Sequence, residues 1–365
     1  MLKTLAATIL LVIILSGCVQ QGTQTATPTA AATANPTIVA TPAATPTPEP
    51  ENVVPADSPQ LPARGFFIGV LPIPAQGQSF DDAYAQTARY SEFVPVWGRP
   101  TPFYNLASDL SGSWGQTFVE QSTRGKQMFP LIHLSFMGAG MTLAKPPGME
   151  SATLSDPTWR AAYKQAALDV VRAARPRYLS LGNEVNRWYE KYGAEGPNGF
   201  KQFVSLYEET YDAVKTVSPE TKVFCVFARE IVDENREADL QVLTLFNASK
   251  MDLLVFTSYP HSLGRTSPSM IPDDYYSNAA EYMPGKPFGF SEIAWPSMQA
   301  FGGEQAQADF IAQATGRLTR DRGINLELFG WPWLHDLDEN DSTGLIKMDG
   351  TEKLGYAAWK NLSGR

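Results

Sequence analysis

The strongest constraint on the fold is a regular alternation of short apolar segments with longer segments of helical composition. Eight apolar runs of strand length recur between residues 65 and 331, and most are apolar throughout. Strands that are apolar on both faces are typical of a parallel sheet covered by helices. Eight such strand–helix units in about 300 residues predict a single (β/α)8 TIM barrel, an α/β fold.

The element boundaries follow from the same pattern. The expected strands cover residues 65–71, 93–98, 128–136, 178–184, 222–228, 253–258, 287–292 and 326–331. The expected helices cover residues 80–92, 114–124, 157–174, 199–217, 239–246, 275–282, 304–322 and 353–361. The alternative is an open doubly wound sheet, but no glycine-rich phosphate loop follows any of these strands. In a barrel, functional residues lie at the carboxyl ends of the strands.

The chain begins with a pattern that predicts export. Residues 1–17 contain Lys3, an apolar run and the small residues LSG directly before Cys18. This pattern is similar to a lipoprotein signal, in which Cys18 would become the lipid-bearing residue. An ordinary secretory signal is the alternative. We therefore expect an exported, cell-surface protein, attached to a membrane through an N-terminal lipid anchor.

Residues 18–60 have a different composition from the rest of the chain. They are rich in Thr, Pro, Ala and Gln and contain few large apolar residues. Such a segment buries too little surface to offset its ordering entropy, so it predicts a disordered tether. The folded domain is expected to span residues 61–365.

Charge and cysteine content argue against nucleic acid as a partner and against a disulfide in the folded domain. The net charge is −9 and the pI is about 5.0, with no basic face, which argues against nucleic acid as a partner. With Cys18 set aside, Cys225 has no cysteine to pair with and is expected in the core. We expect a monomer.

Two glutamates at predicted strand ends indicate the chemistry. Glu184 ends the segment YLSLGNE and Glu292 ends PFGFSE, 292−184 = 108 positions later, with Trp188 and Trp295 close behind. Paired carboxylates can cleave a glycosidic bond, one as a proton donor and the other as a nucleophile or base. Different environments must then separate their pKa values. The alternative is that each caps a helix or pairs with a surface arginine.

These motifs resemble clan A of the retaining (β/α)8 glycoside hydrolases. Gly182-Asn183-Glu184 resembles the end of strand four in that clan, and Ser291-Glu292 resembles the end of strand seven. The resemblance covers nearly all of residues 61–365. It implies that Glu184 is the general acid/base, that Glu292 is the nucleophile and that Asn183 binds a sugar hydroxyl.

The resemblance implies further roles. Tyr259 would orient the nucleophile, Arg99 would support it, and Trp331 would form an aromatic floor under the sugar. Within the clan, the chain is most similar to endo-β-1,4-galactanases and endo-β-1,3-glucanases. Ile293-Ala294 stands where those enzymes usually have Thr-Gly, so the sugar and the linkage stay open.

Aromatic and histidine side chains near the strand ends extend the candidate substrate site. Sugar faces carry C–H groups that pack on aromatic rings, so a glycan cleft needs such platforms. The candidate substrate-binding residues are Trp188, Trp295, Trp331, Trp333, His133 and His261.

The sequence supports a metal site less well than it supports paired-carboxylate chemistry. His133, His261 and His335 all follow strand segments and would allow a zinc hydrolase, although no paired histidine spacing occurs. Asp336, Asp338 and Asn340 alternate as in a calcium loop but lack its central Gly and distal Glu. We expect no metal and no cofactor, with weak structural calcium as the alternative.

The sequence therefore predicts a surface-tethered retaining endo-β-glycanase, β-1,4-galactanase-like, that acts on extracellular polysaccharide. An endo-β-1,3-glucanase is one alternative, and exo action stays open. A non-catalytic glycan-binding lipoprotein on a hydrolase barrel is another.

Overall fold

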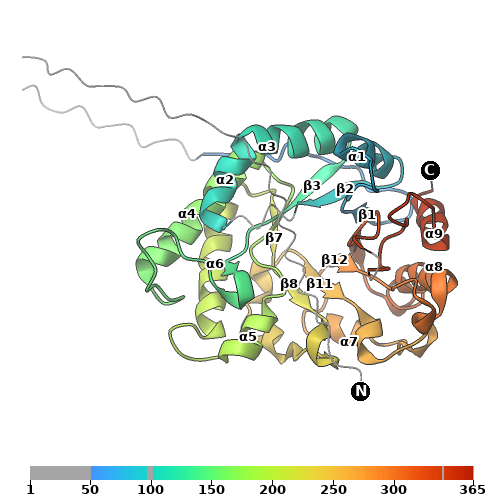
Figure 1. The fold of residues 1–365 in the computed structure, drawn as a ribbon. Coiled ribbons are helices and arrows are strands. Elements are labelled where there is room, and N and C mark those ends of the chain that lie inside the picture. Colours follow the sequence, from blue (N-terminus) through green and yellow to red (C-terminus); the bar gives the residue numbers. More distant parts are fainter. Residues whose placement is uncertain (1–50, 97–101, 339–340, 365) are drawn as a thin grey trace, which may run out of the picture. The chain divides into compact units, whose positions relative to one another are not determined.

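The computed structural model describes residues 51–96, 102–338 and 341–364. Within these residues, parallel strands lie at the centre and helices surround them (Figure 1). The central strands are β1 (Phe67–Val70), β2 (Phe93–Val96), β3 (Phe129–His133), β6 (Tyr178–Ser180), β7 (Lys222–Phe224), β8 (Val226–Ala228), β11 (Leu254–Ser258), β12 (Phe288–Ile293) and β13 (Leu326–Trp331).

The strands close into a barrel of eight. The pairing order is β7-β6-β3-β2-β1-β13-β12-β11-β8. β7 and β8 are two halves of one strand, interrupted at the buried, unpaired Cys225, and the first half pairs with β6 while the second pairs with β11. The break lets one strand complete both neighbouring ladders. The (β/α)8 fold predicted from the sequence is confirmed, as is the core position of Cys225.

The helices pack around the outside of the barrel (Figure 1). They are α1 (Phe80–Ala88), α2 (Phe103–Ser111), α3 (Ser113–Gly115), α4 (Pro157–Ala174), α5 (Asn186–Tyr192), α6 (Phe200–Val217), α7 (Ser277–Ala280), α8 (Gly303–Thr315) and α9 (Leu354–Ser363). α4 shows why these segments are helical. Asp156 accepts the first free N–H groups, Pro157 fits the first turn, and the apolar residues recur on the buried face.

Several boundaries differ from the sequence prediction. The fourth strand ends at Ser180 rather than at residue 184. The segment expected as a helix at 239–246 forms a 3-10 helix, Leu240–Leu245, with Leu240, Val242 and Leu243 buried. Burial at positions 240, 242 and 243 does not fit one face of an α-helix, so tertiary packing decides the geometry here.

Two further helices were misplaced. After β2 the α-helix is α2, and the expected 114–124 helix is mostly a π-helical stretch, Gln116–Thr123. The helix expected at 275–282 is reduced to α7. The short helix α5 was missed because seven residues are fewer than the 11–18 over which an amphipathic pattern can be recognised.

Two small hairpins extend from the ends of the strands. One pairs β4 (Met137–Gly138) with β5 (Thr142–Leu143) after the third strand. The other pairs β9 (Glu230–Ile231) with β10 (Arg236–Glu237) after the fifth strand. Such additions at the carboxyl ends of the strands shape the surface where a barrel places its functional residues.

The packed domain begins before residue 61. Val53 donates its N–H to the Val217 carbonyl at 2.7 Å, and Asp57 forms an ion pair with Arg124 at 2.8 Å. Val217 ends α6 just before β7, so the segment crosses the amino-terminal end of the barrel. Residues 51–60, which the sequence assigned to the tether, therefore belong to the domain because their backbone and charges find partners there.

No helix in the described ranges combines the length and the apolarity needed to cross a membrane.

Candidate active site

The two candidate carboxylates come from different segments at the carboxyl end of the barrel. Glu292 is the fifth residue of β12, in register with Thr257 of β11. Glu184 follows the end of β6 by four residues and lies in the turn that leads into α5. One carboxylate is thus fixed within the sheet, and the other is carried by a loop.

The turn that carries Glu184 is fastened to the fifth strand. Val185 donates its N–H to the Val226 carbonyl at 3.0 Å. The buried side chain of Asn186 makes two hydrogen bonds to Ala228, donating to its carbonyl at 2.8 Å and accepting from its N–H at 2.7 Å. Glu184 itself has a φ of +48°, which is unfavourable for a residue other than glycine. The surrounding bonds hold it there.

Both carboxylate oxygens of Glu184 have partners. The Thr257 hydroxyl donates to Oε1 at 2.9 Å, and the Arg187 guanidinium donates to Oε2 at 3.1 Å. Arg187 also reaches Asp233, at 3.2 Å, on the turn between β9 and β10. The Glu184 side chain remains 22% exposed, so it can meet solvent.

Glu292 has a different environment. The Tyr259 hydroxyl donates to its Oε2. Burial raises the pKa of Glu292 to about 8, the charge of Glu184 acts in the same direction, and the hydrogen bond from Tyr259 opposes them. Burial, followed by the charge of Glu292, also raises the pKa of Tyr259, so the phenol stays protonated and donates.

One strand brings the two carboxylates together. Thr257 and Tyr259 are two positions apart on β11 and its immediate extension, so their side chains point to the same side. Thr257 bonds Glu184 and Tyr259 bonds Glu292. The arrangement places two carboxylates with different environments beside one strand end, as paired-carboxylate chemistry requires.

Three predicted polar residues lie near these ends. Asn183 precedes Glu184 and is half-buried, and its Oδ1 is enclosed and accepts no hydrogen bond from the residues that the structure describes. His133 ends β3, where burial lowers its pKa to about 3. His261 follows Tyr259 on a 3-10 helix, and burial lowers its pKa to about 4. Both rings are therefore neutral at physiological pH.

Three of the four predicted tryptophan platforms are fully buried. Trp188, Trp295 and Trp331 each have 0% exposure, and each indole N–H donates to a loop carbonyl at 2.7–2.9 Å. A ring without exposed surface cannot stack on a sugar, so the structure corrects these three assignments. The rings anchor loops instead. Trp333 is half-buried and keeps exposed surface.

Three predicted residues lie outside the described ranges, namely Arg99, Cys18 and Asn340. Among the residues that the structure describes, no group of three His, Cys, Asp or Glu side chains could hold a metal ion. His335 is buried with its Nδ1 at 2.6 Å from the Ile73 carbonyl. It therefore packs rather than joining His133 and His261.

The acidic loop after β13 already has partners for its charges. Asp336 forms an ion pair with the buried Lys353 at 2.6 Å. Asp338 accepts the N–H of Asp341 at 3.0 Å. A calcium ion at this loop would have to compete with the Lys353 ammonium.

The sequence did not reveal four residues that shape the site. Thr257 carried a signal, since it lies two positions before Tyr259 on a strand. Arg187 also carried one, at the i+3 position from Glu184. Asn186 and the buried Glu230 gave none, because their partners lie on segments distant in the sequence.

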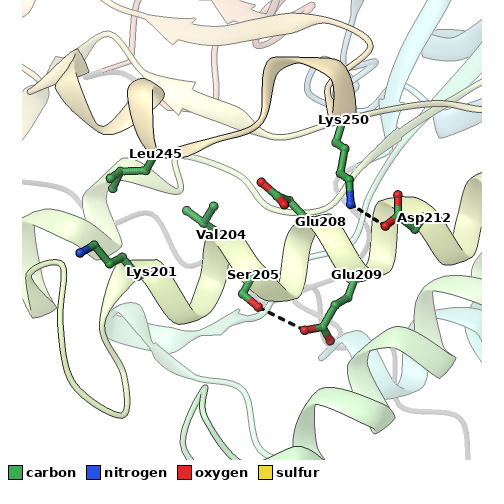
Figure 2. Close-up of a pocket in the computed structure, with 8 residues that line it drawn as sticks. All are labelled: Lys201, Val204, Ser205, Glu208, Glu209, Asp212, Leu245 and Lys250. Carbon is green, nitrogen blue, oxygen red and sulfur yellow. Dashed lines mark hydrogen bonds and ion pairs between the residues drawn. The ribbon is translucent and has the colours of Figure 1, made fainter.

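Two surface hollows lie away from the carboxylates. One, of about 380 Å³, follows the outer face of α6, and Figure 2 shows its lining side chains. Its charges are satisfied by the protein, for example by the Lys250–Asp212 ion pair at 2.6 Å. The other, of about 640 Å³, lies beside Arg229 and contains neither carboxylate. Glu184 and Glu292 line neither hollow.

The sequence matches no protein-family model and no curated protein. Solved structures do match. A GH5_18 protein from Streptomyces cattleya in complex with GlcNAc aligns with a TM-score of 0.58 and 14% identity over 83% of this chain and 81% of its own. A psychrophilic family 10 endo-β-1,4-xylanase aligns with a TM-score of 0.57 and 13% identity over 81% and 96%.

A third solved structure extends the comparison. A family 39 glycoside hydrolase from the gut symbiont Bacteroides cellulosilyticus WH2 aligns with a TM-score of 0.56 and 16% identity over 84% of this chain. The match covers 65% of that protein, just under two thirds of its length. At these identities the likeness shows a shared fold. The barrel expected from the resemblance to clan A is confirmed.

Proposed function

We propose that this protein is a retaining glycoside hydrolase in which Glu184 is the general acid/base and Glu292 is the nucleophile. The observation that carries the proposal is the attachment of both carboxylates to one strand end, through Thr257 and Tyr259. The enclosed Oδ1 of Asn183, which has no donor within the described part of the chain, supports it, because a sugar hydroxyl could donate to that oxygen.

The placement of the two carboxylates favours these roles. A nucleophile must be held rigidly, and Glu292 belongs to β12 and is oriented by a phenol. An acid/base must exchange protons with the leaving group and then with water. Glu184 stands on a turn with its side chain 22% exposed, which suits that task.

The charge environment of the two carboxylates, taken alone, favours the opposite roles, with Glu292 as the acid. Burial raises the pKa of Glu292 to about 8, which favours its protonated form at neutral pH, whereas Glu184 is ion-paired with Arg187. A nucleophilic Glu292 needs a further cation or donor in the working enzyme. The resemblance to clan A names Arg99 for that task.

The proposed reaction proceeds in two displacements. Glu292 attacks the anomeric carbon while Glu184 protonates the departing glycosidic oxygen, which gives a glycosyl ester on Glu292. Glu184 then deprotonates a water molecule that attacks the same carbon, and the Glu292 carboxylate departs. For the first step Glu184 must be released from Arg187 and carry a proton.

Azide rescue of two alanine variants tests the roles. In Glu292→Ala, azide should replace the missing nucleophile and give a glycosyl azide of inverted configuration. In Glu184→Ala, an activated aryl glycoside should still form the ester, and azide should intercept it with net retention. The anomeric configuration of each azide product, read by NMR, distinguishes the two residues.

Each outcome has a definite meaning. Exchanged configurations would assign the roles as charge alone suggests, with Glu292 as the acid. Full activity of both variants without azide would overturn the catalytic assignment. The matched control is Glu327→Gln, which changes a barrel carboxylate bonded to Tyr178 at 2.6 Å, near the strand starts, and leaves the proposed site untouched.

For the substrate, we propose an extracellular β-linked polysaccharide, with β-1,4-galactan first and β-1,3-glucan second. The support is the similarity of the segments around Glu184 and Glu292 to endo-acting galactanases and glucanases. Reducing-end release from galactan, β-1,3-glucan, mixed-linkage glucan, mannan and xylan tests it. No reducing-end release from any of these glycans would favour a glycan-binding protein without catalytic activity.

For location, we propose export and lipid attachment through Cys18, on the evidence of the signal-like residues 1–17. Val53 and Ala56 bond the carbonyls of Val217 and Arg175 at the amino-terminal end of the barrel, opposite to Glu184 and Glu292. An anchor on this side of the domain would be joined to the end of the barrel opposite to the proposed site. Loss of lipid labelling and membrane association in Cys18→Ser tests the anchor.

A further inference from the structure

A third glutamate, Glu230, is buried directly beside the proposed site. It has 3% exposure, and its carboxylate accepts three hydrogen bonds. The Tyr259 N–H donates to Oε2 at 2.7 Å. The hydroxyls of Ser258 and Tyr275 donate to Oε1 at 3.0 Å and 2.6 Å. All three donors come from β11 or from the segment that follows it.

The environment of Glu230 compensates its burial. Desolvation raises the pKa of Glu230, and its hydrogen bonds together with the charge of Arg229 oppose that rise. The Arg229 guanidinium lies 3.9 Å from the centre of the Tyr275 ring and pairs with Glu237 at 2.8 Å. Such an arrangement is costly to bury, so a role beyond filling space is expected.

The position of the Glu230 bond in the barrel indicates that role. The backbone ladder between strands five and six ends where the Arg229 N–H donates to the Thr257 carbonyl at 2.9 Å. Beyond that point Tyr259 leaves strand geometry with φ −131° and ψ 66°. Its N–H, the last donor before Pro260, is taken by the Glu230 carboxylate. The Glu230 side chain therefore binds the first N–H beyond the end of the backbone ladder.

We propose that Glu230 is the positioning residue for Tyr259, and through it for the Glu292 carboxylate. This inference rests on the proposed function, in which Glu292 is the nucleophile. Glu230 bonds the backbone of Tyr259 and not Glu292, and the Tyr259 hydroxyl bonds Glu292. Glu230 thus acts only by fixing where the phenol stands.

A double-mutant cycle between Glu230→Ala and Tyr259→Phe tests the inference. Glu230→Ala should lower kcat by about 100-fold, as displacement of an oriented group by about 1 Å does, and should leave KM within about twofold. In the Tyr259→Phe background the same change should lower kcat no further, because the phenol that Glu230 positions is already gone.

Two variants separate positioning from general destabilisation. Glu230→Gln keeps an oxygen for the Tyr259 N–H, and the two hydroxyls can turn to accept from its amide, so kcat should recover to within about fivefold of wild type. The matched control is Asp252→Ala. Asp252 also accepts a backbone N–H, from Val223 at 2.7 Å, and a tyrosine hydroxyl, from Tyr211 at 3.0 Å, but near the strand starts. Its loss should lower the Tm and leave kcat unchanged.

The outcomes are distinct. Full additivity in the cycle, or an equal loss of kcat in Asp252→Ala, would overturn the positioning role. Absence of hydrolysis by the wild-type protein would overturn the proposed function instead. In that case a crystal structure of Glu230→Ala decides the inference. A Tyr259 hydroxyl that has left Glu292 supports it, and one that has not moved refutes it.

Discussion

Thr257 near the end of β11 and Tyr259 just beyond it bond two different carboxylates through their hydroxyls. Thr257 donates to Glu184 at 2.9 Å, and Tyr259 donates to Glu292. The two carboxylates are 108 positions apart in the sequence (292−184). This strand end holds both of them, so changes to its hydroxyls should act on catalysis more than on folding.

Thr257→Val should lower kcat about tenfold and leave the fold intact. Valine keeps the shape of the side chain but removes the donor to Glu184 Oε1, which frees the carboxylate to turn. Steady-state kinetics on the substrate found by the glycan panel measure the loss. The matched control is Thr210→Val on α6, whose buried hydroxyl bonds the Leu206 carbonyl at 2.7 Å. An equal kcat loss in both variants would contradict the role of Thr257.

Glu292→Gln should stabilise the fold increasingly as the pH rises. The pKa of Glu292 is raised to about 8 from its ordinary 4.5. The stability that this group contributes is therefore present below its ordinary pKa and is lost as the pH rises through about 8. Glutamine never ionises, so its Tm advantage over wild type should be near zero at low pH and largest above pH 8. A Tm difference independent of pH would contradict this environment.

Lys353→Met should destabilise the loop after β13. The Lys353 side chain is 1% exposed and bonded to Asp336 at 2.6 Å, so the variant leaves a buried carboxylate without its cation, at a cost of about 3–5 kcal/mol. The pKa of Asp336 is already raised to about 6. The deficit should therefore be smaller at pH 5, where Asp336 takes up a proton, than at pH 8. Urea unfolding at both pH values measures it.

The control for that variant is Lys360→Met, which removes a surface ion pair with Glu352 of the same 2.6 Å length. Its cost should stay within about 1 kcal/mol because solvent screens the pair. Equal costs for the two lysine variants would contradict the importance of burial. Added calcium should leave the stability of the wild-type protein unchanged in the same measurements, because the Lys353 ammonium already binds the Asp336 carboxylate.

The segment 51–60 should be needed for full stability. A chain that starts at residue 51 keeps the Val53–Val217 hydrogen bond and the Asp57–Arg124 ion pair, whereas one that starts at residue 61 loses both. Thermal unfolding should show a lower Tm for the shorter chain, by about 2–4 °C for each kcal/mol lost. Equal Tm values for the two chains would show that residues 51–60 belong to the tether and not to the domain. Asp57→Asn in the longer chain should reproduce part of the loss.

The sequence by itself determined the barrel and its two candidate carboxylates. Strand and helix periodicity is local, and eight apolar strands with helical connections leave few topologies. Glu184 and Glu292 could be found because each stands close behind an apolar run. The prediction of aromatic platforms was wrong for three tryptophans because burial is not a local property. The sequence gives the position of Trp188, Trp295 and Trp331 but not whether a loop covers the ring.

Only the tertiary structure decided which groups surround each carboxylate. The partners of Glu184 and Glu292 come from β11, the residue that follows it and α5, and those of Glu230 are Ser258, Tyr259 and Tyr275. Hydrogen bonds and burial depend on which segments meet in space. The pairing of strands five and six, with strand five broken at Cys225, sets those meetings. Local sequence carries no record of such contacts, so the environment that tunes each carboxylate had to be read from the folded barrel.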